Sequence, residues 1–158
     1  MPICLRNSRK ENEENRINQS SPEDRKKNRV NNENITYEWF EQLPEQCPPK
    51  DAMPCNGVYY RIAKEVPTDS DDYFSQRKMQ PNGIFIGNGV DECVLHAVSL
   101  FSVLGDAQKR LKLPKFRKQI VVKVTLTPKD GVIKKTFGTS HHSWWRSTKF
   151  EYVQVTIA

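Results

Sequence analysis

The sequence predicts an α+β fold, a mostly antiparallel sheet of four to six strands with two or three helices. Alternating or β-branched apolar segments recur at residues 57–66, 119–127 and 149–157, which is the pattern of strands. Helix-start signals and turn residues separate these segments, and that order of elements favours antiparallel pairing. The first 34 residues hold almost no aliphatic side chains, so the fold must be built by the rest of the chain.

This difference in composition predicts three parts. Residues 1–34 form a disordered charged arm, because they offer too little apolar surface to offset the entropy of ordering. Residues 35–56 combine a short amphipathic helix at 35–43 with a linker that holds four prolines in residues 44–55. Residues 57–158 form the compact domain.

In the first half of that domain, a strand at 57–66 ends at Pro67. Thr68 and the acidic residues that follow it predict a helix over 69–78. The three glycines and two asparagines of residues 79–90 predict a loop or hairpin around a short strand, the apolar triplet IFI.

Residues 91–113 allow two interpretations, a single buried helix or a strand followed by a helix. We favour a strand at Val98–Phe101 and a helix capped at Ser102 that runs to Leu111, because Gly105 and Asp106 fit poorly inside one long helix.

In the second half, the segment 119–127 is the clearest strand, and turn residues at 128–131 predict a hairpin with a strand at 132–136. The last predicted strand, 149–157, carries Glu151 at its head on the apolar face.

Charge is distributed unevenly along the chain. The net charge of +6 divides into +2 for residues 1–35, −6 for residues 36–107 and +10 for residues 108–158. A basic C-terminal third indicates either an anionic partner or a surface that docks on the acidic middle of the same chain.

The cysteines and the absence of long apolar runs predict a location. No apolar run approaches the ~18 residues of a membrane span, and the N-terminal residues lack the apolar core of a secretory signal. We therefore expect a cytoplasmic protein without membrane contact, in which Cys4, Cys47, Cys55 and Cys93 are reduced thiols. A zinc site at Cys47 and Cys55 is the alternative, although their spacing is longer than usual.

The most unusual segment is FGTSHHSWWRST, residues 137–148, predicted as a loop between two strands. One interpretation is a ligand pocket, in which a tryptophan stacks on a planar group while a histidine or the arginine contacts a polar one. The other is packing, with Trp144 on the core and the histidines bonded to the loop backbone. The candidate ligand-binding residues of this segment are His141, His142, Trp144, Trp145 and Arg146.

Other kinds of site find less support. Adjacent histidines point in different directions on an extended backbone, so we predict no metal site. The glycines match no phosphate-binding fingerprint, and Ser99 and Ser102 lack a GxSxG context.

Three residues occur in an order that resembles the layout of ADP-ribosyltransferase-like domains: Arg61 on the first strong strand, Ser99 on a short strand before a helix, and Glu151 late in the chain. The resemblance covers residues 57–158, but residues 149–151 are Lys-Phe-Glu and not a paired Glu-x-Glu or Gln-x-Glu. It implies NAD as cofactor, with Arg61 on a phosphate, Tyr60 or Trp144 stacked on nicotinamide, and Glu151 stabilising charge at the ribose. The candidate catalytic residues are Arg61, Ser99 and Glu151.

Two non-enzymatic hypotheses stand beside this one. The basic cluster Lys109–Lys118, together with Trp145 and Arg146, would bind nucleic acid through its phosphates and bases. Alternatively, the arm of residues 1–34 would recruit a protein partner.

Overall fold

The computed structural model describes residues 34–87 and 90–158. Residues Ile35–Ala158 form one compact unit, so the predicted helix and linker at 35–56 belong to the same unit as the domain. The predicted arm lies, apart from Asn34, outside the described residues.

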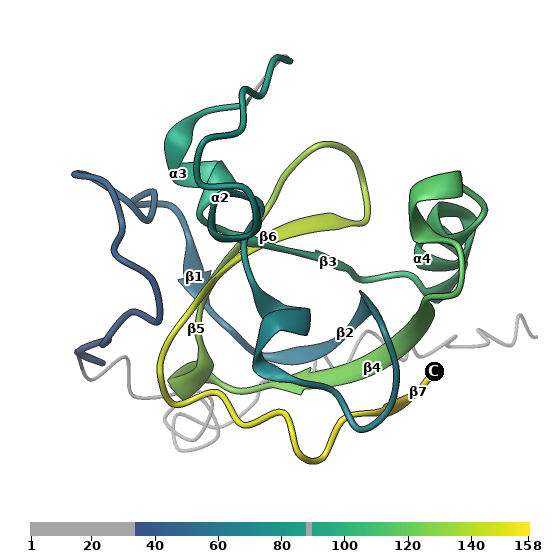
Figure 1. Ribbon diagram of the computed structural model, residues 1–158. Helices are drawn as coiled ribbons and strands as arrows, with labels where there is room; N and C mark the ends of the chain where they lie inside the picture. Colours follow the sequence, from purple (N-terminus) through teal and green to yellow (C-terminus); the bar gives the residue numbers. More distant parts are fainter. Residues whose placement is uncertain (1–33, 88–89) are drawn as a thin grey trace, which may run out of the picture. The chain divides into compact units, whose positions relative to one another are not determined.

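In the described residues, seven strands form one sheet whose neighbours all pair antiparallel (Figure 1). The α+β prediction is confirmed, with one strand more than the expected range. The sheet order is β1-β5-β6-β3-β2-β4-β7. The strands are β1 (Met53–Pro54), β2 (Gly57–Ala63), β3 (Val98–Phe101), β4 (Ile120–Leu126), β5 (Gly131–Lys135), β6 (His141–Arg146) and β7 (Thr156–Ile157).

Short helices connect the strands. The α-helices are α2 (Gln76–Met79), α3 (Glu92–Leu95) and α4 (Leu104–Leu111), and the 3-10 helices are η1 (Ser70–Tyr73), η2 (Pro114–Phe116) and η3 (Pro128–Asp130). None of the described helices is long and apolar enough to cross a membrane.

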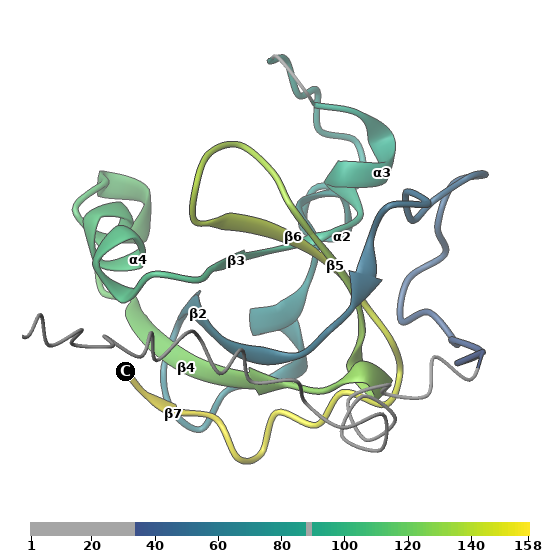
Figure 2. The same cartoon turned by 180° about the vertical axis from the view of Figure 1, so that it is seen from behind.

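The sheet is weakest at its centre, between β2 and β3. Strand β2 pairs with β4 over seven residues, and β3 pairs with β6 over four, but β2 and β3 share only the pair Tyr60 and Phe101. Seen from behind, β2 runs beside β4 (Figure 2). Polar backbone groups at this junction therefore need partners other than a continuous strand ladder.

Adjacent tryptophans on β6 contribute to two different cores. Successive side chains of a strand point to opposite faces, so Trp144 joins the cluster with Val98, Leu100 and Phe150, whereas Trp145 packs with Ala97 and others. Both indoles are fully buried. Both indoles therefore contribute to the packing of the sheet.

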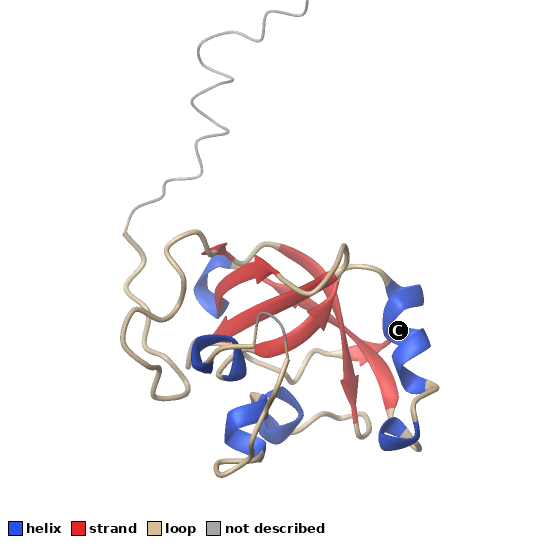
Figure 3. Cartoon of the chain, turned by 90° about the horizontal axis from the view of Figure 1, so that it is seen from above, coloured by secondary structure: helices blue, strands red, loops and turns tan. Residues whose placement is uncertain are grey.

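Helix α4 covers one end of the sheet (Figure 3). Its buried Ala107, with Leu104 and Leu111 beside it, packs on Phe101 of β3 and Val121 of β4. The opposite face of α4 and the segment after it are exposed and basic.

Several predicted elements are confirmed. The strand at 57–66 is β2, the strand at 119–127 is β4, and a strand followed by a helix replaces the single-helix alternative for 91–113. The helix begins after Val103, and Ser102 instead donates to the Ser140 carbonyl.

Other predicted elements are wrong. The helix over 69–78 is two short pieces, η1 and α2, because the chain is extended at Phe74 and Ser75. Residues 35–43 form no helix, and residues 84–86 form no strand. Of the strand predicted at 149–157, only Thr156–Ile157 pairs.

The predicted β4–β5 hairpin is also wrong. Strand β5 crosses to pair with β6 and β1, while β4 pairs with β2 and β7. Gly131, at φ 131°, marks this change of direction, and a Cβ there would collide with the Trp145 carbonyl oxygen.

The cysteine prediction needs correction. Cys47 and Cys93 form a disulfide, which ties the proline-rich segment to α3, and Cys55 is a free thiol buried in the core. Cys47 and Cys55 are therefore not a zinc pair. Disulfides persist in oxidising compartments and are rare in the cytosol, so the cytoplasmic prediction loses its cysteine argument.

Candidate functional site

Arg61 lies where β2 and β3 diverge, and backbone carbonyls hold it there. Its Nε donates to the Asp72 carbonyl and its Nη1 to the Ser99 carbonyl, each at 2.9 Å. Among the described residues, no carboxylate forms an ion pair with this guanidinium, and no hydrogen bond uses its Nη2. Burial lowers its pKa to about 10, so it is still cationic at neutral pH.

Ser99 and His141 form a hydrogen-bonded pair across β3 and β6. The Ser99 Oγ and His141 Nε2 are 3.0 Å apart, and His141 Nδ1 lies 3.2 Å from the Thr136 carbonyl. Nδ1 also lies 3.0 Å from the Thr136 hydroxyl oxygen. With a proton on Nδ1 donated to the Thr136 carbonyl, Nε2 accepts from the Ser99 hydroxyl. Burial lowers the pKa of His141 from its ordinary 6.5, so the neutral imidazole of this arrangement is the form at pH 7.

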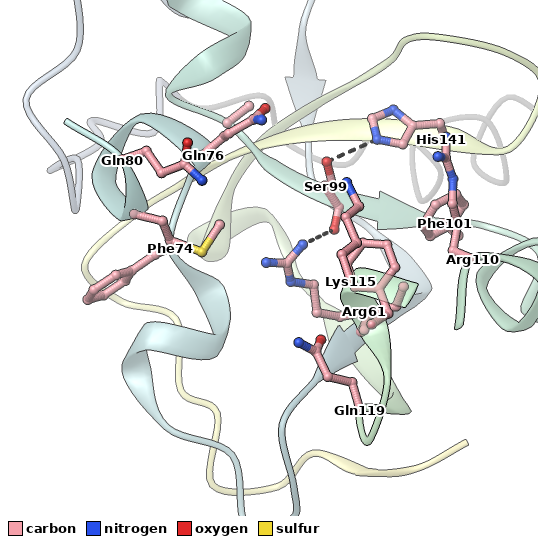
Figure 4. A pocket seen from close by; sticks show the side chains of 14 residues that line it. Arg61, Phe74, Gln76, Gln80, Ser99, Phe101, Arg110, Lys115, Gln119 and His141 are labelled. Atoms are coloured by element: carbon pink, nitrogen blue, oxygen red, sulfur yellow. Dashed lines mark hydrogen bonds between the residues drawn. The ribbon is translucent and has the colours of Figure 1, made fainter. Parts of the chain in front are cut away.

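A cavity of about 460 Å³ opens between these side chains and the helices around them (Figure 4). Its lining includes three cations, Arg61, Arg110 and Lys115, and no acidic residue. Figure 4 shows Phe74, Gln76 and Gln80 on one side and Phe101, Arg110 and His141 on the other. The remaining lining residues are Ile62, Met79, Ala97, Ser99, Phe116 and Gln119.

This lining suits a particular kind of ligand. Cations without ion-pair partners attract phosphate or another anion, and phenylalanines beside amides suit a planar group with polar edges. No metal ligand set lies here, since a lone imidazole is the only usual metal donor among the lining residues.

The structure brings together three of the predicted site residues. Arg61, Ser99 and His141 line one cavity. Tyr60, the neighbour of Arg61 on β2, does not line this cavity and packs with the α4 cluster.

The other predicted residues lie elsewhere. Glu151 is exposed in an irregular segment after Phe150 and does not line the cavity, so it cannot stabilise charge on a ligand bound there. His142 donates to the Ser140 carbonyl and packs edge-on against Tyr59, outside the cavity.

Trp144, Trp145 and Arg146 are structural residues, which corrects their predicted ligand contacts. The two indole N–H groups donate to the carbonyls of Asp130 and Cys93. Arg146 is 7% exposed and lies 3.8 Å from the centre of the Phe40 ring. None of the three can reach a ligand without unfolding the core.

Some lining residues were missed. Arg110 and Lys115 were noted in the basic cluster, but nothing in their spacing indicated that α4 and η2 carry them to Arg61. Phe101 sits two positions after Ser99, an alternation that places both side chains on one face of β3 and could have been noticed.

No protein family, curated protein or solved structure matches this chain.

Proposed function

We propose that the Arg61 cavity binds a nucleotide that carries a diphosphate, with NAD as the first candidate, and that the Ser99–His141 pair acts on it. The observation that carries this proposal is a half-buried arginine that faces the cavity and forms no ion pair with any described carboxylate. Arg110 and Lys115 add two further cations at the same cavity. A diphosphate matches such a concentration of positive charge, and the phenylalanines match a base or nicotinamide ring.

The volume is consistent with this ligand class. Pockets for small molecules and cofactors span roughly 300–1,000 Å³, and this cavity holds about 460 Å³. A dinucleotide is large for a cavity in the lower part of that range, so one end of NAD would extend toward solvent.

The chemistry available at the site is proton transfer. A neutral His141 can take a proton through Ser99 from a hydroxyl or water that attacks C1′ of the nicotinamide ribose. The C–N glycosidic bond breaks with both its electrons leaving on nicotinamide, the new C–O bond forms, and the released proton rests on His141. The resemblance to ADP-ribosyltransferase-like domains implies that a glutamate late in the chain stabilises the positive charge that develops at the ribose. Here no acidic side chain lines the cavity, so the bound diphosphate must supply the negative charge.

Ligand binding is tested by thermal shift with NAD, ADP-ribose, ADP and nicotinamide riboside at equal concentration. We expect the three diphosphates to raise the melting temperature of the wild type and the phosphate-free riboside to leave it unchanged. Arg61→Gln should lose the shift, whereas Lys129→Gln, an exposed residue away from the cavity, should keep it. No shift with any diphosphate would overturn the proposal.

Turnover is tested separately, by chromatography of nicotinamide released from NAD. Ser99→Ala and His141→Gln should each lower release by about 100-fold or more, the usual contribution of general base catalysis, while ADP-ribose still binds. Release that persists in both variants would remove the pair from the chemistry.

A further inference from the structure

The exposed side of α4 and the segment after it form a basic face, here defined as Lys109–Lys118. Six exposed cations lie within these ten residues: Lys109, Arg110, Lys112, Lys115, Arg117 and Lys118. Of these six cations, only Lys109 forms an ion pair with a described residue, Asp106 at 3.5 Å. The face therefore carries a large uncompensated positive charge, which a structural role for the segment does not require.

A second cavity connects this face to the site. It holds about 380 Å³ and shares Phe101, Arg110 and His141 with the Arg61 cavity. Lys109 and Phe137 also line it. The two cavities are thus adjacent, and His141 lines both.

The polar groups of the second cavity leave its positive charge dominant. Asp106 is the acidic residue of its lining, and it accepts from the Ser140 hydroxyl and lies beside Lys109. Those contacts lower the pKa of Asp106, first the hydrogen bond from Ser140 and then the charge of Lys109. The carboxylate is satisfied within the protein, while Arg110 makes no ion pair among the described residues.

An exposed aromatic side chain stands at the rim. Phe137 is 50% exposed and adopts φ 52°, a strained conformation for a phenylalanine. Its ring lies 5.5 Å from the His141 ring. The exposed part of this side chain can contact a planar group of a ligand.

We propose that the basic face binds a single-stranded nucleic acid and places one of its nucleotides in the second cavity, beside His141. Free cations along a surface with an exposed aromatic at a cavity are the combination that binds single strands, since the cations contact phosphates and the ring stacks on a base. The proposal names the macromolecular partner of the site in the proposed function and rests on it for the role of that site.

The geometry favours a single strand over other polyanions. A base must leave a duplex to enter a cavity, at a cost of a few kcal/mol, whereas a single strand offers its bases freely. An acidic protein or an anionic membrane would use the cations but not the cavity or Phe137.

Binding is measured by fluorescence anisotropy of a labelled 12-nucleotide oligothymidylate, without NAD, across a salt series. Four phosphate contacts would give log K a slope of about −3 against log salt concentration. The test variant is Lys109→Gln, Lys112→Gln, Arg117→Gln, three residues that do not line the Arg61 cavity. The control is Lys50→Gln, Lys129→Gln, Lys149→Gln, which removes three exposed charges elsewhere.

We expect the test variant to bind about tenfold or more weakly at 0.1 M salt, with a slope near −1, and the control to bind like the wild type. Phe137→Ala should weaken binding about fivefold or more, and Phe137→Tyr, which retains the ring, should restore it. A blunt duplex of the same length should bind more weakly than the single strand.

Three results would overturn the proposal: no salt-sensitive binding at low ionic strength, equal losses in the test and control variants, or binding only to vesicles with anionic lipid. The thermal shift with NAD is independent of all three. Loss of oligonucleotide binding with the NAD shift intact would remove this inference alone, and the reverse result would remove the proposed function alone.

Discussion

Arg61 on β2 and Arg146 on β6 both donate to backbone carbonyls of the segment Ser70–Tyr73. Their surroundings differ. Arg146 is sealed beneath Phe40 and the core, with Nη2 on the Ser70 hydroxyl. Arg61 faces a cavity and has an N–H group with no described partner. Arg146 also has an N–H group without a described partner, its Nε, but that group is buried. The two arginines thus differ in access, and only Arg61 lines a cavity that a ligand could enter.

Loss of the disulfide near Arg146 should lower the stability of the protein more than any other change considered. Cys47 and Cys93 are 46 residues apart and the Trp145 indole donates to the Cys93 carbonyl. Closing a loop of that length stabilises a fold by up to about 4 kcal/mol. Cys47→Ser should lower the free energy of unfolding by about that amount in denaturant titrations, while the affinity for ADP-ribose stays within twofold.

Reduction of the wild type provides the control. Dithiothreitol should destabilise the wild type to the level of Cys47→Ser and leave that variant unchanged. If reduction had no effect on the wild type, the disulfide would not form in the protein.

Arg146→Met should cost about 3 kcal/mol of stability. The change leaves the Ser70 and Tyr73 carbonyls without their donor and removes the cation from the face of Phe40. The measurement is the denaturation midpoint, and Arg117→Met, at an exposed position, should change it by less than about 0.5 kcal/mol. An equally small effect at Arg146 would contradict its structural role.

Arg61→Gln should reduce ligand affinity strongly and stability only slightly, the opposite of Arg146→Met. We expect at least about a 30-fold loss of affinity for ADP-ribose by calorimetry, equivalent to roughly 2 kcal/mol, but a loss of stability of only about 1 kcal/mol. Arg61→Lys should remain weak, because an ammonium group cannot hold two carbonyls and a phosphate in the same fork geometry. Equal losses of stability in the Arg61 and Arg146 variants would erase the distinction between the two sites.

The smallest expected effect is the titration of His141. Burial lowers the pKa of its imidazole below 6.5, so the unfolded chain binds a proton there that the folded chain does not. The free energy of unfolding should therefore fall as the pH drops below 6.5 toward the folded-state pKa.

Imidazole resonances in NMR spectra should show a neutral ring at pH 7, and bound ADP-ribose should raise the pKa because an anion favours the charged form. His141→Gln should remove the resonance that titrates below 6.5. A His141 pKa above 6.5 in the free protein would mean that the ring is solvated rather than held by Ser99 and Thr136.

The strands were predictable where local pattern decides them. Strands β2 and β4 alternate or are β-branched, so their existence followed from sequence, but the pairing of β5 with β6 and β1 rather than β4 depends on long-range packing. The same limit explains the site. The resemblance indicated Arg61 and Ser99, which line the cavity. It also indicated Glu151, which lies outside the cavity because the predicted last strand does not form around it.

The tryptophans show a second limit. Two indoles beside two histidines suggested a pocket, yet strand alternation sends Trp144 and Trp145 into separate cores. The segment was predicted as a loop, and assigning it as a strand would have revealed this. Of the two adjacent histidines, only His141, the first residue of β6, lines the cavity.

A crystal structure with ADP-ribose bound tests the central claim most directly. We predict a phosphate oxygen about 3 Å from Arg61 Nη2, with the ribose facing Ser99 and His141. Phosphates bound only along Lys109–Lys118, with the Arg61 cavity empty at saturating ligand, would contradict it.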